Sequence, residues 1–228
     1  MEPAPLQIVF ALFPRITQLD FTGPHEVLWR LPGARLTLAS AAGGPVPADG
    51  GLVFDTVKLA DVAQCDVLLV PGGMGVVPAL EDPVFVDALR RLGGPARYVV
   101  SVCSGSLALA AAGLLRGRRA ACHWAWRELL AEFPEVTPDA ARVVRDGRVF
   151  SGGGVTAGID VALTLAAELT SPALAQAVQL GIEYAPAPPF DCGRPELAPA
   201  DIRDAVTERL QRLRPDRVAA CRRAAARA

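Results

Sequence analysis

RYVVSVCSGSLALAAAGLL, residues 97–115, is the stretch of this chain that decides the predicted fold. Residues 98–102 are apolar and rich in β-branched side chains, which is typical of a buried strand. Residues 104–112 are mostly small or straight-chain helix formers, and Gly113 follows them as a helix end. Cys103 therefore lies in the sharp turn between a strand and a helix. This is the geometry of a nucleophile elbow, where α/β-hydrolases carry a serine.

The position of Cys103 at the start of a helix predicts a reactive thiol. The helix dipole and the free N–H groups at a helix N-terminus favour the thiolate over the thiol. The alternative is a structural cysteine, because free cysteines are among the most buried residues of proteins. The other four cysteines have no such turn around them and are predicted to be bystanders: Cys65, Cys122, Cys192 and Cys221.

Composition limits the classes of protein to which the chain can belong. With 228 residues, 51% hydrophobic and 21% charged, we expect one α/β domain over residues 1–228, with a core at about 6–193 and a C-terminal helical extension at 194–228. A net charge of −1 gives no electrostatic reason for a nucleic-acid partner. The five scattered cysteines argue against a disulfide framework and a zinc site. No apolar run is long enough to span a membrane and no signal peptide is apparent, so the expected location is the cytoplasm.

Strand-length apolar segments alternate with helical ones along the chain, which predicts a doubly wound, mostly parallel sheet with helices on both faces. A helix is expected to begin near Pro24, after a loop that carries Asp20, and another to cover residues 124–133. Hairpins are expected around residues 52–57 and at Asp146-Gly147. The predicted strands of the main sheet are 7–13, 35–40, 66–70, 98–102, 119–122 and 148–150.

The C-terminal sixty residues are predicted to contain three helices. The first covers residues 172–182, and a proline-rich segment, YAPAPPFDCG, follows it. A second helix from Pro199 carries an apolar stripe, which is expected to pack on its own domain or on a partner subunit. Residues 214–228 carry five arginines and are expected to form a frayed or packing helix rather than a nucleic-acid arm.

Candidate site residues follow directly after the predicted strands. Ligands of parallel sheets bind beyond the carboxyl ends of the strands, so these residues should converge on one rim. They are Asp20, Gly72, Gly73, Cys103, His123 and the glycines 152–154.

Each of these residues has a chemical role and a plainer alternative. Asp20 can exchange a proton with the thiol, or it can serve the turn before its helix. Gly72 and Gly73 can offer bare N–H groups as an oxyanion hole, or they can simply make a turn. His123 can pair with Cys103, or it can be a buried histidine beside Trp124. Because no histidine follows residue 123, mechanisms that need a late histidine are excluded.

The glycine run 152–154 does not indicate a nucleotide site. It lacks the lysine of a Walker motif and the spacing of a dinucleotide fingerprint. Neither a nucleotide nor a metal is therefore expected.

Four segments resemble, in order and spacing, the PfpI/DJ-one superfamily and within it the isocyanide hydratase branch. They are LFPRITQLDFTGPHEVL, PGGMGV, YVVSVCSGSLALAAAGLL with RRAACHWAW, and SGGGVTAGIDVALTLAAEL. The resemblance runs from residue 7 to about 190. It implies a flavodoxin-like homodimer that works without metal or cofactor.

The resemblance also implies a reaction. Cys103 would add to the carbon of an isocyanide to give a thioimidate, Asp20 would handle protons, and water would release an N-substituted formamide. Ser104 stands where this branch often has threonine, beside the nucleophile. Thr22, His123, Gly154 and Thr156 would line the pocket. A glyoxalase-like hydrolase with the same thiolate, and a cysteine oxidation or small-molecule sensor, remain as alternatives.

Features of other branches are missing from the sequence. PfpI-type proteases place histidine directly after the cysteine, where this chain has Ser104, and class I glutamine amidotransferases need a late histidine. Glyoxalase-like members generally have glutamate in place of Asp20. Some thirty-five residues follow Gly193, fewer than the helix-turn-helix region of related transcriptional activators requires.

Overall fold

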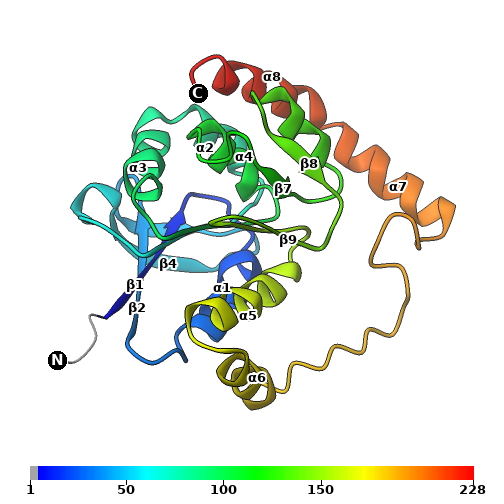
Figure 1. Cartoon of the computed structure of the whole chain (residues 1–228). Helices are drawn as coiled ribbons and strands as arrows, with labels where there is room; N and C mark the ends of the chain where they lie inside the picture. The colour runs from blue at the N-terminus through cyan, green and yellow to red at the C-terminus, as the bar shows by residue number, and fades with distance from the viewer. Residues whose placement is uncertain (1–4) are drawn as a thin grey trace.

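A central eight-stranded sheet organises the computed structural model, which describes residues 5–228 (Figure 1). The strand order is β3-β4-β2-β1-β5-β6-β10-β9, and all neighbours from β4 to β10 are parallel. The antiparallel edge pairs β3–β4 and β9–β10 are the two predicted hairpins. The strands are β1 (Leu6–Leu12), β2 (Ala34–Ser40), β3 (Gly44–Pro47), β4 (Val53–Lys58), β5 (Val67–Val70), β6 (Tyr98–Val102), β9 (Val143–Asp146) and β10 (Val149–Gly152).

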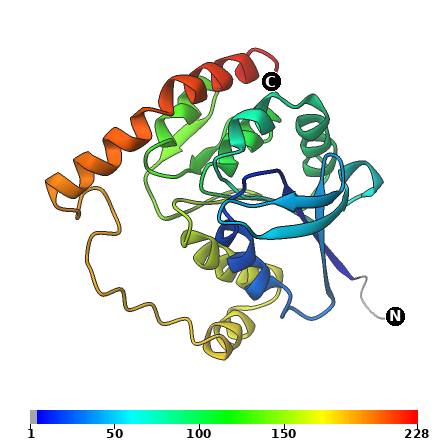
Figure 2. The ribbon, with the colours of Figure 1, turned by 180° about the vertical axis from the view of Figure 1, so that it is seen from behind.

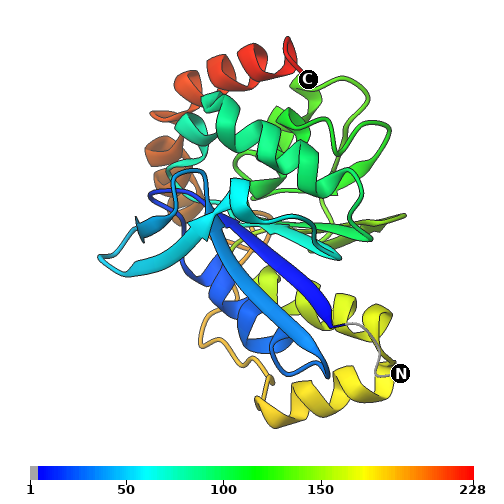
Figure 3. The same ribbon diagram turned by 90° about the vertical axis from the view of Figure 1, so that its left-hand side faces the viewer.

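Helices cover both faces of the sheet, as the alternation of strands and helices predicts (Figures 1 and 3). One face carries α1 (Leu19–Leu28), α5 (Ala157–Leu169) and α6 (Pro172–Gly181). The other carries α2 (Val76–Glu81), α3 (Pro83–Gly93) and α4 (Gly105–Ala111), with a short 3₁₀ helix, η1 (Leu59–Asp61), before β5. Strands β5 and β6 are buried along their whole length, as expected for strands covered on both sides. The fold is the predicted flavodoxin-like one.

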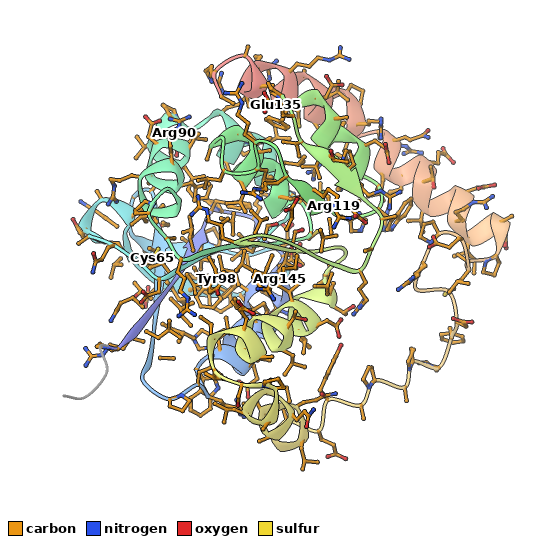
Figure 4. The ribbon with its side chains drawn as sticks, viewed as in Figure 1. Cys65, Arg90, Tyr98, Arg119, Glu135 and Arg145 are labelled. Carbon is orange, nitrogen blue, oxygen red and sulfur yellow. The ribbon has the colours of Figure 1, made fainter. Side chains whose placement is uncertain are left out.

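Polar side chains tie α5 to the sheet beneath it. Tyr98 and Arg145 both lie close to this helix (Figure 4). The Tyr98 hydroxyl donates to Glu168 of α5 at 2.9 Å, and Arg145 forms an ion pair with the same carboxylate at 2.7 Å. Phe150 of β10 packs edge-on against the Tyr98 ring. These contacts fix the helix that follows the glycine run, and with it the loop that leads there from β10.

Three predicted elements differ from the structure. Helix α1 begins at Leu19 rather than near Pro24, so Asp20 lies in its first turn; a proline this close to the N-terminus removes only one hydrogen bond of the helix. Strand β7 (Arg119–Ala121) pairs with β8 (Thr137–Asp139) in a separate two-stranded sheet. The predicted helix at 124–133 is reduced to a 3₁₀ helix, η2 (Arg127–Glu132), whose entry is tightened by i→i−3 bonds from Trp126 and Leu129.

The C-terminal segment leaves the body and returns to it. Between α6 and α7 (Ala200–Gln211) the chain runs as an extended arm, and α7 projects beyond the rest of the molecule (Figures 1 and 2). The predicted stripe packs on its own domain only at its C-terminal end: Leu210, and Leu213 just after the helix, are half-buried against the core, whereas Ile202 is exposed. Helix α8 (Arg214–Ala225) is a packing helix, as one of the two expectations had it: it lies against α2, α4 and η2.

Within residues 5–228, no helix is long and apolar enough to cross a membrane.

Candidate active site

Cys103 occupies the predicted elbow between β6 and α4. Its φ of +59° lies in the left-handed region, which non-glycine residues rarely adopt and which clusters at functional sites. Its N–H donates to the carbonyl of Gly152, the last residue of β10, at 3.1 Å. Gly105 makes the tight turn possible, because a Cβ there would lie 2.2 Å from the carbonyl oxygen of Val70. The nucleophile elbow predicted from the sequence is therefore present.

Asp20 approaches this cysteine from the first turn of α1. Its side chain is fully buried, and its Oδ2 accepts a hydrogen bond from the N–H of Gly72 at 2.9 Å. Its Oδ1 has no well-formed hydrogen bond to any group of residues 5–228, and the thiol of Cys103 lies beside the carboxyl group. Asp20 is thus held by the backbone on one side and faces the sulfur on the other.

Burial sets the protonation of this pair. Desolvation raises the pKa of Asp20 to about 7, against the opposing effects of the Gly72 N–H and of the neighbouring Cys103 thiol. Desolvation, followed by the negative charge of Asp20, raises the pKa of Cys103 well above its usual value. The N–H of Ser104 at the start of the helix lowers the thiol pKa, as expected, but burial and the charge of Asp20 outweigh it, so the net shift is upward. At neutral pH the Cys103 thiol is protonated, and Asp20 is close to its own pKa, so it can take up or release a proton.

Gly72 and Gly73 shape the site without opening an oxyanion hole. A Cβ on Gly72 would lie 2.5 Å from the nitrogen of Ser104 and 2.9 Å from the Cβ of Cys103, so only glycine fits there. The Gly72 N–H donates to Asp20, and the Gly73 N–H donates to the Ser104 hydroxyl at 3.2 Å. Both N–H groups are engaged by the protein itself, contrary to the prediction that they are free for a substrate. They position the carboxyl and the hydroxyl beside the sulfur.

His123 does not form a dyad with Cys103. Its Nδ1 accepts from the N–H of Ala125 at 3.3 Å, and its ring lies against Trp124, as the plainer of its two interpretations expects. Desolvation, and then the charge of Arg217, lower the pKa of His123 to about 4, so the ring is neutral at physiological pH. No hydrogen bond joins His123 to Cys103 within the described residues. His123 instead lines the cavity described in the next paragraph.

A cavity of about 260 Å³ lies beyond the carboxyl ends of β7 and β10. His123, Gly154 and Thr156 line it, but Cys103 and Asp20 do not. Thr22 lies outside it and bonds to Gln18 of the preceding turn at 2.7 Å. Thr156 accepts a hydrogen bond from Arg142 at 3.2 Å. The segment 193–196 of the C-terminal arm closes the cavity on another side. Within residues 5–228, no three histidine, cysteine, aspartate or glutamate side chains are grouped to hold a metal.

Arg217 is the residue of this region that the sequence analysis missed. It comes from α8, is only 3% exposed, and lies with its guanidinium 4.3 Å from the centre of the Trp126 ring. Its Nη2 donates to the carbonyl of Gly73 at 3.5 Å. Because an arginine-rich C-terminus suggests a solvated face, the sequence analysis did not single out Arg217 as a buried residue. The detectable signal is its spacing from the small residues Ala220, Cys221 and Ala224, at i+3, i+4 and i+7, which form one buried stripe.

Residues 6–168 match the family model described as the DJ-1/PfpI family. An isonitrile hydratase of Pseudomonas putida is 51% identical over 205 residues, which cover 90% of this chain and 90% of that protein. The HTH-type transcriptional regulator CdhR of Pseudomonas aeruginosa is 35% identical over 173 residues, which cover 73% of this chain but 51% of the regulator.

Solved structures show the same fold. The crystal structure of a ThiJ/PfpI family protein from Pseudomonas syringae superposes with a TM-score of 0.92 at 38% identity, covering 96% of this chain and 91% of the other. DJ-1beta of Drosophila melanogaster superposes with a TM-score of 0.70 at 26% identity, covering 80% of this chain and all of that one. The match to the Pseudomonas syringae protein thus includes most of the C-terminal arm and helices, which the family model does not reach.

Proposed function

The chain belongs to the DJ-1/PfpI family, and on that premise we propose that it is an isocyanide hydratase with Cys103 as its nucleophile. Isonitrile is another name for isocyanide, and the 51% identity to an isonitrile hydratase extends over nine-tenths of both chains. The observation that carries the proposal for this chain is the buried pair of Asp20 and Cys103 at the elbow. Hydration of an isocyanide requires both a nucleophile and a group that moves protons at neutral pH.

The first step that we propose is the addition of the thiol to the substrate. Ionised Asp20 takes the proton from Cys103, and the sulfur forms a bond to the terminal carbon of R–N≡C. Burial is the larger cause of the high thiol pKa, and the negative charge of Asp20 is the second; protonation of Asp20 removes the second and so favours the thiolate as it attacks. Asp20 then returns the proton to the same carbon, which gives the thioimidate R–N=CH–S–Cys103. A carboxyl with a pKa of about 7 suits both transfers.

The second step that we propose is hydrolysis of the thioimidate. Water adds to its carbon, and Asp20 takes a proton from the water and passes it to the nitrogen. The tetrahedral adduct R–NH–CH(OH)–S–Cys103 then expels the sulfur, and its hydroxyl proton returns to the pair. The product is the N-substituted formamide R–NH–CHO, and the enzyme regains its thiol. Water and the isocyanide are the only reactants, so the proposal includes no cofactor.

Turnover of a simple isocyanide tests the proposal. We expect the purified protein to convert cyclohexyl isocyanide to N-cyclohexylformamide, with ¹⁸O in the product when the reaction runs in H₂¹⁸O. The value of kcat/KM should rise from pH 5.5 to 8 with an apparent pKa near 7, because the reaction begins with ionised Asp20. Exhaustive dialysis against a chelator should leave the rate unchanged.

The same assay separates the alternatives. If a correctly folded protein forms no formamide from the isocyanide, the proposal is wrong. Turnover of methylglyoxal would then favour the glyoxalase-like hydrolase, and stoichiometric oxidation of Cys103 without turnover would favour the sensor.

We also propose that the protein is a homodimer built through the C-terminal arm. Four of its largest exposed apolar side chains fall within residues 180–202: Leu180, Phe190, Leu197 and Ile202. They lie on α6, on the extended arm and on α7, and exposed apolar side chains along a segment that leaves its own domain suit a segment that another chain covers. Light scattering after gel filtration should give twice the mass of one chain. The double variant Phe190→Ser/Ile202→Ser should shift the protein toward monomer, whereas Val84→Ser, an exposed apolar site on α3, should not.

A further inference from the structure

Arg217 is a buried cation without a carboxylate partner within residues 5–228. We propose that Arg217 is a positioning residue whose charge stabilises the thiolate of Cys103 and whose hydrogen bond fixes the Gly73 turn beside it. The inference deepens the proposed function, because it names the counter-charge for the anionic sulfur on which that reaction depends. Its experimental readout does not require an isocyanide, so the two proposals can fail separately.

The contacts of Arg217 connect α8 to the elbow. Nη2 donates to the Gly73 carbonyl at 3.5 Å and lies 3.6 Å from the sulfur of Met74. The N–H of the same Gly73 donates to the Ser104 hydroxyl, and Ser104 directly follows the nucleophile. Trp126 covers the face of the guanidinium, with the ring centre 4.3 Å away. The arginine is therefore two hydrogen bonds from the residue next to Cys103.

The charge of Arg217 is left uncompensated by the described protein groups. The neighbouring arginines of α8 are exposed and paired, Arg222 with Glu132 and Arg223 with Glu81. Arg217 has no such ion pair within residues 5–228, and its buried Nη1 has no hydrogen-bond partner there. Burying an unpaired charge is unfavourable, and the Trp126 ring offsets only part of the cost. An anion that forms near Arg217 during the reaction would offset the remaining cost of burying its charge.

The ionisable groups around Arg217 identify that anion. They are Cys103 at the elbow, Cys122 and His123 after β7, and Cys221 on α8 itself, while Asp20 faces Cys103 from α1. Desolvation lowers the pKa of Arg217, and the charges that oppose this are Cys103 first, then Cys122 and Cys221. In turn, the charge of Arg217 lowers the thiol pKa values of Cys122 and Cys221 against the stronger effect of burial. Its link to Cys103 is geometric, through the hydrogen bond to Gly73 beside the elbow. His123 is neutral, and burial raises the pKa of Cys122 to about 11 and that of Cys221 to about 12, so both thiols stay protonated. In the proposed reaction Asp20 takes the proton of Cys103, so Cys103 is the group that becomes anionic.

The pH dependence of thiol alkylation tests the proposal. Trypsin releases residues 98–116 as one peptide in which Cys103 is the only cysteine, so mass spectrometry follows its reaction with methyl methanethiosulfonate alone. In Arg217→Gln we expect the rate at pH 7 to fall about tenfold or more, because the apparent pKa of Cys103 rises by about a unit or more. The rate at high pH, where the thiol is ionised, should match the wild type. Arg217→Lys, which keeps the charge, should lose less than Arg217→Gln.

The matched control is Arg222→Gln, which removes an exposed, paired arginine from the same helix and should leave the alkylation profile unchanged. Circular dichroism checks folding. If Arg217→Gln does not fold, Arg217→Lys is tested in its place. A smaller but measurable shift in the pH dependence of Cys103 alkylation is then expected, because an ammonium group does not reproduce the guanidinium contacts. An unchanged Cys103 profile in a folded variant would overturn the proposal. So would a loss that appears only as a higher KM for isocyanoacetate and not for cyclohexyl isocyanide, since Arg217 would then bind a substrate carboxylate.

Discussion

Cys103→Ala is expected to reduce formamide production to the uncatalysed rate, a loss of about 10³-fold or more in kcat. Without the sulfur no covalent intermediate can form, and Asp20 has no partner at the elbow. The fold should survive, because alanine retains the Cβ, and the hydrogen bond from residue 103 to Gly152 is made by the backbone. Formamide measured by chromatography, together with a wild-type circular dichroism spectrum, checks the expectation.

Serine at position 103 provides a sharper version of the same test. Cys103→Ser retains a hydroxyl at nearly the same place, but an alcohol is far less acidic and less nucleophilic than a thiol. Asp20, with a pKa of about 7, is a weak base for such a proton, so a loss close to that of alanine is expected. Substantial turnover by either variant would rule out the covalent route. The matched control is Cys65→Ala, a buried thiol whose sulfur faces the carbonyl of Leu92, well away from the elbow, and it should keep wild-type turnover.

Local sequence was sufficient to predict the elbow. The apolar run before Cys103 and the small helix formers after it specify strand, turn and helix without help from the rest of the chain. Parallel strands also made it possible to predict that Asp20 and Gly72 would meet Cys103 at one rim, and the hydrogen bond between Asp20 and Gly72 shows that they do. This part of the site depends on backbone periodicity, which a sequence displays directly.

The sequence does not show how buried groups from different elements shift one another's pKa values or satisfy one another's hydrogen bonds. The direction of the Cys103 pKa depends on desolvation and on a carboxylate 83 positions earlier in the chain, and burial outweighs the helix N-terminus. Gly73 was predicted to offer a free N–H, but the acceptor that takes it, Ser104, is known only once the loops are placed. The spacing of Arg217 from small residues can reveal that it is buried, but its partners Trp126 and Gly73 come from different elements and cannot be read from the sequence.

Asp20→Asn is expected to lower kcat/KM for the isocyanide by about 100-fold or more, because in the proposed mechanism Asp20 exchanges protons with the sulfur and with the substrate carbon. The amide oxygen can still accept the hydrogen bond from Gly72, so the elbow should retain its geometry. Asp20→Glu keeps a carboxyl but adds a methylene to a fully buried side chain, so some activity at reduced stability is expected. Turnover of cyclohexyl isocyanide near the wild-type rate in Asp20→Asn would contradict this role.

The stability of the same variant should move in the opposite direction to its activity. Folding raises the pKa of Asp20 from 3.8 to about 7, so the folded state holds this proton more tightly than the unfolded state. The resulting stabilisation of the wild type is complete below about pH 4 and is lost as the pH rises to 7. The side-chain amide of Asp20→Asn is neutral at every pH in this range, so this position contributes no pH-dependent loss of stability in the variant.

Urea unfolding across this range measures the effect. The free energy of unfolding of Asp20→Asn minus that of the wild type should rise between pH 4 and 7, by up to about 4 kcal/mol, and then stay constant. A difference independent of pH would mean that Asp20 is not held neutral by its burial. If Asp20→Asn is more stable but inactive, burying the Asp20 carboxyl costs the wild type folding free energy. The proposed proton transfers are what the protein gains in return.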